Sequence, residues 1–423
     1  MPDAASPIWH PFTQHAVAPP AILIERGEGA RLITPDGRRI IDAIASWWVT
    51  LHGHGHPRIA AAIAAQAATL EQVIFAGFTH APAETLARRL LARAPAGLEV
   101  AFFSDSGSTA VEVAVKMAVG FWHHRGEQRT RIVALEDGYH GDTFGAMACG
   151  ARGLFTEPYW PMLFHVERLP FPRAGAEEAS IEAFAALLQR DARSVAALIL
   201  EPLVLGAGGM RMYSPWLLQA LADLCRRHGV LLIADEVMTG FGRTGTFFAC
   251  EQAGVAPDLM CLSKGLTGGF LPLGVTLATK AIYDAFYTAD RAKMFFHSSS
   301  YTGNPIACAA ALASLDIWDD EPVFARIEAI AAQHRQRLEG LRGRAEVVET
   351  RQAGTIAAIE LRVPAAGYLA ELGPRLYRFF LERDVLLRPL GNVVYVLPPY
   401  CITRDELDAV YDAISEALTL VNV

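Results

Sequence analysis

The sequence predicts an α/β fold, with a large domain built on a mostly parallel central sheet and a smaller α+β domain. Three observations support this prediction. The chain has 423 residues, which is too long for one compact core. Hydrophobic residues make up 52% of it and charged residues 19%, enough for a large apolar interior. Its middle part alternates short apolar runs with helical patterns, which is typical of a parallel sheet covered on both faces.

Along the chain, residues 1–50 form an N-terminal segment that we assign to the small domain and to the active site. Within it "LITPDGRRIID" predicts a hairpin with Asp36 and Gly37 at its turn. Residues 51–303 form the large domain. Its predicted strands are Val100–Phe103, Arg131–Leu135, Val195–Glu201, Val230–Val237 and Asp258–Ser263, with predicted helices at Thr109–Phe121 and Pro215–His228.

Near Asn304 the alternation of strands and helices gives way to long helical patterns followed by shorter strands. Residues 304–423 are expected to form the small domain. The predicted elements are helices Pro305–Trp318 and Val323–Leu341, then strands Ile356–Val363, Val385–Leu390 and Val393–Pro399. A last helix is predicted to start at Thr403, where Glu406 completes a capping box.

Composition excludes several classes of function. The formal net charge is −8 and no basic tract offsets it, which argues against a nucleic-acid partner. No run reaches the ~18 apolar residues of a membrane span, and the N-terminus lacks the pattern of a secretory signal. The six cysteines are scattered without a CxxC pair, as in a reducing compartment. We expect a cytoplasmic protein that acts on small molecules.

Two charged residues stand at the ends of predicted core strands. Asp235 ends "LLIAD", and Lys264 follows "LMCLS" and precedes a glycine-rich turn. Parallel strands would bring both residues to the same edge, where ligands gather in sheets of this kind. A buried lysine loses its proton more easily and becomes a nucleophile toward carbonyls. Taken singly, Asp235 fits a structural ion pair and Lys264 fits a surface lysine.

Two further features point to the same edge. In "SDSGSTAVEV" a strand gives way to Ser106, Gly107 and Ser108 and then directly to a helix, a pattern that suits a phosphate group. An ordinary helix cap has the same pattern. In "DGYHGDTFGAM", Tyr139 follows a strand and could place its ring against a planar ligand or in the core.

A phosphate site, a stacking aromatic ring, a carboxylate and an amine together suit pyridoxal 5'-phosphate (PLP). In that interpretation Asp235 keeps the ring nitrogen protonated. Lys264 binds the cofactor covalently and then moves protons. Lys264, Asp235 and Tyr139 are therefore the candidate catalytic residues.

The sequence resembles the class III PLP-dependent aminotransferases of fold type I along nearly its whole length. The motifs include "SWWVTLHGHGHP", "GYHGDTFGA", "ADEVMTGFGRTG" and "LLRPLGNVVYVLPPY". Within this class it is most similar to the branch that aminates 8-amino-7-oxononanoate in biotin biosynthesis, usually with S-adenosylmethionine as donor. The resemblance implies a homodimer with shared active sites. It implies that the cofactor-binding residues are Gly107, Ser108, Tyr139, Asp235, Val237 and Lys264, together with Ser299 and Ser300 of the neighbouring subunit.

The resemblance also implies the substrate residues. Trp47 would line an apolar wall and Arg388 would bind the distant carboxylate of the keto acid, beside Phe12, Tyr139, Lys264 and Ser298. Phe12 stands where the family usually has tyrosine, and Ser298-Ser299-Ser300 replaces a more typical Gly-Pro-Thr. The amino donor therefore stays open between S-adenosylmethionine and lysine. An ω-amino acid or diamine aminotransferase is the alternative within the class.

Other signals carry less weight. His52, His54 and His56 alternate in the pattern of metal ligands on a strand, but no cysteine or carboxylate cluster accompanies them, so we expect no metal. Gly206 and Gly208 match the first two glycines of a dinucleotide-binding loop, which would indicate a nicotinamide-dependent oxidoreductase. Arg211, however, stands where the third glycine of that motif is required. For Arg243 we expect a substrate contact, with a structural cation as the alternative.

Overall fold

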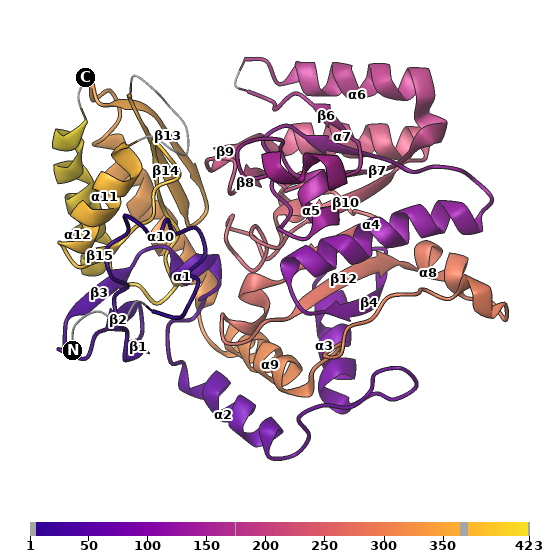
Figure 1. The fold of residues 1–423 in the computed structure, drawn as a ribbon, viewed down its shortest axis with the longest axis horizontal. Helices are drawn as coiled ribbons and strands as arrows, with labels where there is room; N and C mark the ends of the chain where they lie inside the picture. The colour runs from indigo at the N-terminus through magenta and orange to yellow at the C-terminus, as the bar shows by residue number, and fades with distance from the viewer. Residues whose placement is uncertain (1–5, 174, 364–370, 422–423) are drawn as a thin grey trace.

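A seven-stranded sheet forms the centre of the large domain, in the order β4-β12-β11-β10-β7-β5-β6 (Figure 1). The computed structural model describes residues 6–173, 175–363 and 371–421. The strands are β4 (Leu98–Ser104), β5 (Arg131–Leu135), β6 (Val166–Leu169), β7 (Val195–Leu200), β10 (Leu231–Asp235), β11 (Leu259–Leu262) and β12 (Gly274–Thr279). β12 runs antiparallel to both of its neighbours, β4 and β11, and the other strand pairs of this sheet are parallel. The predicted mostly parallel sheet is confirmed, while β6 and β12 were not predicted.

Helices cover both faces of this sheet, and alternate residues of each strand face opposite layers. In β10, Leu231 and Ile233 pack in the cluster that contains α4 (Gly107–His124), whereas Leu232 and Ala234 pack in the cluster that contains α6 (Glu178–Asp191) and α7 (Pro215–His228). Such two-sided burial explains why the strands read as continuous apolar runs. The remaining elements of this part are α5 (Phe144–Cys149), β8 (Val204–Leu205), β9 (Arg211–Met212) and α8 (Lys280–Phe286).

The small domain combines the two ends of the chain. Figure 1 shows the N-terminal strands beside the C-terminal elements. β1 (Arg26–Glu28), β2 (Arg31–Ile33) and β3 (Arg39–Asp42) form a sheet with β15 (Val385–Leu386). The predicted hairpin is confirmed between β2 and β3, and Gly37 at its turn has a φ of 86°.

A second, antiparallel sheet completes the small domain. It contains β13 (Val347–Ala353), β14 (Ile356–Leu361) and β16 (Val393–Val396), accompanied by α10 (Val323–Glu339), α11 (Leu372–Leu381) and α12 (Arg404–Ala417). The capping box at Thr403 is confirmed: its hydroxyl accepts a hydrogen bond from the Glu406 backbone at 3.2 Å. The strand predicted at Val385–Leu390 is shorter than expected, because only Val385 and Leu386 join a ladder and Leu390 makes an isolated bridge with Val393.

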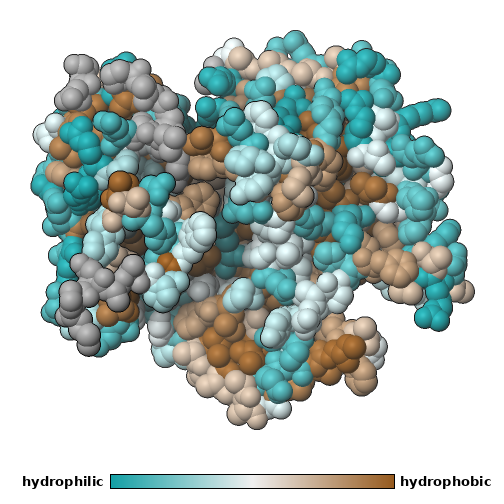
Figure 2. Space-filling model, in the orientation of Figure 1, coloured by the Kyte–Doolittle hydropathy of each residue, from teal (hydrophilic) through white to brown (hydrophobic). Residues whose placement is uncertain are grey.

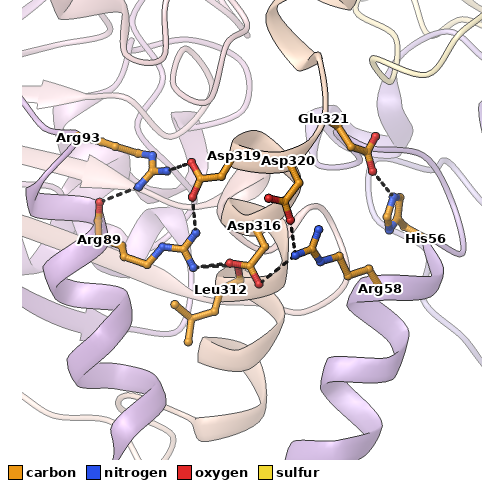
Figure 3. Close-up of polar contacts among 9 residues, drawn as sticks. All are labelled: His56, Arg58, Arg89, Arg93, Leu312, Asp316, Asp319, Asp320 and Glu321. Carbon is orange, nitrogen blue, oxygen red and sulfur yellow. Dashed lines mark hydrogen bonds and ion pairs between the residues drawn. The ribbon is translucent and has the colours of Figure 1, made fainter.

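Helix α9 (Pro305–Asp320) connects the two parts and packs against α2 (Pro57–Ala67) and α3 (Ala81–Leu91). Figure 3 shows a charge network at its C-terminal end. Arg89 lies 2.6 Å from Asp316 and 2.9 Å from Asp319, and Arg58 lies 2.6 Å from Asp320. Because the aspartates are shared among several arginines, the network fixes the packing of α9 better than one surface pair would. None of the described helices is long and apolar enough to cross a membrane.

Candidate active site

Asp235 and Lys264 lie at the same edge of the central sheet. Asp235 is the last residue of β10 and pairs in parallel register with Cys261 of β11, the strand that Lys264 follows. The glycines after Lys264 allow the turn to pack tightly. A Cβ on Gly265 would lie 2.9 Å from the Leu51 side chain, and one on Gly269 would lie 2.8 Å from the Thr50 Cα. Glycines follow Lys264 because a side chain at either position would clash with the segment around Leu51 and Thr50.

The Asp235 carboxylate is buried and held by two donors. The Val237 backbone N–H donates to Oδ1 at 3.1 Å, and Nδ1 of His140 lies 2.7 Å from Oδ2. The other ring nitrogen of His140 is buried without a hydrogen-bond partner among the described residues. Sequence reasoning missed His140, although it stands next to Tyr139 in the motif "DGYHGD". The His140 ring therefore holds the Asp235 carboxylate in place through this contact.

Lys264 is partly buried, with a φ of 41°. Its Nζ lies 5.0 Å from the centre of the Trp48 ring. Burial lowers the pKa of the amine below its usual value, and the nearby carboxylates of Asp235 and Glu201 oppose this shift. The lowered pKa increases the fraction of neutral, nucleophilic amine near neutral pH.

Glu201, which follows β7, is a second buried carboxyl group beside this edge. It accepts hydrogen bonds from the backbone N–H groups of Tyr139 at 3.0 Å and Gly206 at 2.9 Å. Burial raises its pKa to about 7. Glu201 was predicted only as the end of a strand, because its neighbours in the chain give no sign of its contact with Tyr139.

Tyr139 lies beside Glu201 at this edge of the sheet. Its backbone is fixed by Glu201, and burial together with the Asp142 carboxylate raises the pKa of its phenol. The hydroxyl is therefore a neutral hydrogen-bond donor at physiological pH. Its place after β5 agrees with the predicted position at the sheet edge.

The start of α4 is the place where the sequence predicts an anion site. Ser106 is the N-cap, and its hydroxyl accepts a hydrogen bond from the Thr109 backbone at 3.2 Å, so this hydroxyl caps the helix. Gly107 faces Val237, and a Cβ at Gly107 would lie 2.6 Å from the Val237 side chain. Ser108 accepts from the Asp142 backbone at 3.1 Å. The helix start thus places Gly107 against Val237, two residues after Asp235, and Ser108 against the Asp142 backbone.

Phe12, Trp47 and Arg388 come together from three distant parts of the chain. The Phe12 ring lies 5.6 Å from that of Trp47 and 5.9 Å from that of Phe155. The Arg388 guanidinium lies 5.3 Å from the centre of the Trp47 ring and donates to the Phe12 carbonyl at 3.0 Å. The cluster forms a partly exposed wall of aromatic rings with one cation on it.

The serine segment lies apart from these contacts. The Ser299 hydroxyl donates to Asp105 of the same chain at 2.8 Å, and Ser298 donates to the carbonyl of Ser299 at 3.2 Å. Ser298 and Ser300 are exposed. The predicted contact of Ser299 and Ser300 with a neighbouring subunit stays a prediction.

Comparison with known proteins places the chain in a family. Residues 12–418 match the model of the family described as aminotransferase class-III. The chain belongs to the class-III aminotransferases. It is 52% identical to the adenosylmethionine-8-amino-7-oxononanoate aminotransferase of Synechococcus elongatus, over 97% of this chain and 98% of that protein. It is 40% identical to the protein of the same name from Geobacter sulfurreducens, covering 98% and 96% of the two chains.

Solved structures agree with this assignment. An adenosylmethionine-8-amino-7-oxononanoate aminotransferase from Methanocaldococcus jannaschii superposes with a TM-score of 0.93 at 36% identity, covering 98% of this chain and 97% of that one. A PLP-bound amine transaminase from an uncultivated Pseudomonas species gives a TM-score of 0.91 at 35% identity, covering 99% and 100%. This class-III aminotransferase is therefore a PLP-dependent enzyme of fold type I.

The residues at the sheet edge fit PLP. Gly107 lets the start of α4 approach the Val237 side chain, where a Cβ would clash, and the N-terminus of α4 offers backbone N–H groups to a phosphate. The buried Asp235 carboxylate suits a cationic ring nitrogen, since His140 and Val237 leave acceptor capacity on its oxygens. The amine of Lys264 lies on the adjacent strand end.

The remaining signals have structural explanations in this aminotransferase. His54 contacts Asp42 at 2.8 Å, His52 contacts Ser314 at 3.1 Å, and the described residues contain no group of three side chains that could hold a metal. The loop with Gly206 and Gly208 joins the hairpin strands β8 and β9 instead of opening a helix.

Arg243, for which a substrate contact was expected, is instead a buried structural cation. It donates to the Pro398 carbonyl at 2.7 Å and to the Trp48 and Thr50 carbonyls at 3.4 Å. Its guanidinium also lies 5.0 Å from the centre of the Tyr400 ring. These contacts tie the C-terminal part of the chain to the segment that carries the two tryptophans.

Proposed function

We propose that the enzyme transfers an amino group to 8-amino-7-oxononanoate, giving 7,8-diaminononanoate in biotin biosynthesis, with S-adenosylmethionine as the donor. The observation that carries the proposal is the position of Arg388 over Trp47. A guanidinium on an aromatic wall suits a long apolar chain that ends in a carboxylate. The names of the relatives at 52% and 40% identity, which match nearly the whole chain, support the same reaction.

The proposed site divides the work among its residues. Bound PLP supplies an aldehyde that takes up amino groups and a ring that withdraws electrons. Gly107, Ser108 and the N–H groups of α4 bind the phosphate, while Tyr139 and Val237 enclose the ring. Asp235, whose Oδ2 contacts Nδ1 of His140 at 2.7 Å, would keep the ring nitrogen of bound PLP protonated.

Lys264 is the covalent anchor and the proton carrier. With PLP bound, Lys264 would hold the cofactor covalently, and its Nζ would accept a proton from a substrate carbon and return it at the neighbouring position. Its lowered pKa favours the neutral amine that this role needs. Trp48, 5.0 Å away, attracts the ammonium form through its ring face and keeps the amine at the site.

A second candidate keeps the fold and changes the substrates: lysine as donor, or an ω-amino acid or diamine exchanged with a small keto acid. Phe12 favours this alternative, because it lacks the hydroxyl that the family usually offers to a substrate. Solved neighbours described as an amine transaminase and as an (S)-enantioselective omega-transaminase, at 35% and 32% identity, also support it.

We also propose a cytoplasmic homodimer whose two sites are shared, in which Ser299 and Ser300 reach the phosphate in the partner. Phe296 and Tyr301, on either side of these serines, are 67% and 64% exposed, and large exposed apolar side chains mark interfaces. Figure 2 shows further hydrophobic side chains at the lower edge, over α2. The six cysteines are all free, as in a reducing compartment.

A half-reaction experiment tests the proposed function. Protein loaded with PLP is mixed first with S-adenosylmethionine and then with 8-amino-7-oxononanoate. The cofactor absorbance should change with the donor and return with the keto acid. Failure of the keto acid to restore the spectrum, while pyruvate does so, would establish the second candidate. Lysine is tested in parallel as donor, with Phe12→Tyr as the variant that restores the hydroxyl.

Reduction with borohydride tests the anchor. It should attach the cofactor to Lys264, found by peptide mapping, and Lys264→Ala should lose turnover by at least ~10³-fold with an unchanged melting temperature. Lys280→Ala is the matched control, since Lys280 is an exposed lysine paired with Asp284 at 2.6 Å. Multiple turnovers by Lys264→Ala would remove the proposed role.

A further inference from the structure

The two adjacent tryptophans of the site lie on a strained turn. Trp47 is 43% exposed and contacts Arg388, whereas Trp48 is 5% exposed and contacts Lys264. They diverge because the short α1 (Ala45–Trp48) is not a regular helix. Ala45, Ser46 and Trp48 have φ values of 50°, 59° and 68°, a region that residues with side chains rarely adopt. A neighbouring group must hold this conformation.

The Asp42 carboxylate is that group. It is fully buried at the end of β3 and accepts from the backbone N–H groups of Ile44 at 3.2 Å and Ser46 at 2.6 Å. The Ser46 hydroxyl lies 3.4 Å away, and Nε2 of His54 lies 2.8 Å from the same carboxylate. One side chain thus satisfies the N–H groups that this turn cannot pair within a helix.

The same residue is linked to Arg388. Asp42 pairs with Leu386 in the parallel ladder of β3 and β15, and Arg388 follows that strand. The Ala43 N–H also donates to the Leu386 carbonyl at 3.2 Å. Asp42 therefore fixes the turn of the tryptophans at the point where the chain that delivers Arg388 is attached.

We propose that Asp42 is a positioning residue for substrate binding, which holds the Ile44–Trp48 turn so that Trp47 meets Arg388 and Trp48 meets Lys264. This role rests on the proposed function as far as the keto acid is concerned. The position of Trp48 beside Lys264 does not depend on which keto acid is used. Asp42 touches neither tryptophan ring in this role and acts through the backbone.

The test compares Asp42→Asn with a matched control. The amide nitrogen cannot accept the Ser46 N–H bond, so the turn should relax. Asp258→Asn is the control, because Asp258 also accepts a backbone N–H, from Leu232 at 2.8 Å, but lies at the end of β11 opposite to Lys264. Both variants are assayed as PLP-loaded enzymes, with melting temperatures measured first.

Two readouts distinguish positioning from general stability. Asp42→Asn should raise the KM for 8-amino-7-oxononanoate about 10-fold or more and change kcat by less than about 3-fold. It should also lose at least half of the quenching of Trp48 emission on loading PLP, where Trp48→Phe defines the Trp48 signal. Asp258→Asn should leave both unchanged.

An unchanged KM and unchanged quenching in Asp42→Asn would overturn the proposal, and so would equal effects in Asp258→Asn. If the wild-type enzyme does not use the keto acid, the proposed function fails and the quenching alone decides the role of Asp42. If Asp42→Asn does not fold, His54→Leu removes one donor to the carboxylate and is measured in the same way. It should shift KM and quenching in the same direction, and wild-type values would contradict the role.

Discussion

Lys264 and Glu201 lie close together, and burial shifts both toward their neutral forms. Burial lowers the pKa of the amine and raises that of the carboxyl. Opposite shifts at one sheet edge are typical of sites that move protons. The strained φ of 41° at Lys264 points the same way, because such a conformation costs about 1–3 kcal/mol and persists where the surroundings enforce it.

Glu201→Gln should flatten the pH dependence of stability in the cofactor-free protein. The folded carboxyl has a pKa of about 7 against an ordinary 4.5. The folded state therefore keeps a proton that the unfolded state has lost between these values. Its contribution, about 3 kcal/mol at most, is full below pH 4.5 and is lost as pH rises through 7. Urea midpoints at pH 5, 6, 7 and 8 check this, with Glu339→Gln as surface control. Equal slopes in wild type and Glu201→Gln would contradict it.

Arg388→Ala should weaken binding of the keto acid by about 2 kcal/mol, which corresponds to about a 30-fold higher KM, because a charge-assisted hydrogen bond is lost. The half-reaction with S-adenosylmethionine should change much less. Steady-state kinetics with both substrates measure the difference. Arg383→Ala serves as the control, since Arg383 pairs with Glu416 at 2.8 Å on the surface. An unchanged KM in Arg388→Ala would exclude this arginine from the substrate site.

At the scale of elements, the strands with strong apolar runs could be predicted and the irregular ones could not. The five predicted strands of the central sheet end within two residues of those observed. The antiparallel β12 lies between glycines and turns, and the strained α1 has no helical periodicity, so neither shows a local pattern. We propose that the small domain begins near residue 304. Its first helix, α9, packs on α2 and α3 of the preceding part of the chain and so connects the two domains.

His334 joins three elements of the small domain. Its ring lies 2.7 Å from the Tyr411 hydroxyl of α12 and 3.1 Å from the Thr355 carbonyl before β14. Burial lowers its pKa to about 4. Below pH 6.5 the His334 ring is therefore protonated in the unfolded state but stays neutral in the folded state. The free energy of unfolding falls as the pH drops from about 6.5 to 4.

His334→Gln should remove most of this acid sensitivity, which amounts to about 3 kcal/mol. At pH 7 it should cost about 1–3 kcal/mol, since one buried hydrogen bond is lost. Urea unfolding at pH 7 and pH 5 measures both effects. The exposed His165→Gln should behave like wild type. An acid loss as steep in His334→Gln as in wild type would show that other groups cause it.

At the scale of the whole molecule, the substrate wall draws on distant parts of the chain. Phe12 and Trp47 come from the N-terminal segment and Arg388 from the small domain, while Lys264 belongs to the large domain. Figure 1 shows both chain ends in the small domain beside the central sheet. Changes in how the two domains pack should therefore alter substrate binding before they alter cofactor binding.

Hybrid dimers test whether the sites are shared. Lys264→Ala and Ser300→Glu should each be inactive, the second because a carboxylate would repel the phosphate in the partner. Coexpression of the two chains should restore about one quarter of wild-type activity, since half of the dimers are hybrids and each has one intact site. Activity assays of the unfractionated coexpressed dimers measure this, and hybrids purified with tandem tags should show about half of wild-type activity. Hybrids without activity would place Ser300 and Lys264 in the same site.

The sequence by itself determined the local chemistry: the apolar strands, the hairpin at Gly37, the cap at Thr403, and Asp235 and Lys264 at strand ends, because each follows from neighbouring residues. Only the tertiary structure decided which distant groups meet. His140 behind Asp235, Glu201 beneath Tyr139, and Asp42 under the two tryptophans are buried contacts between separate elements. Such contacts depend on how the elements pack, and chain spacing carries no record of that packing.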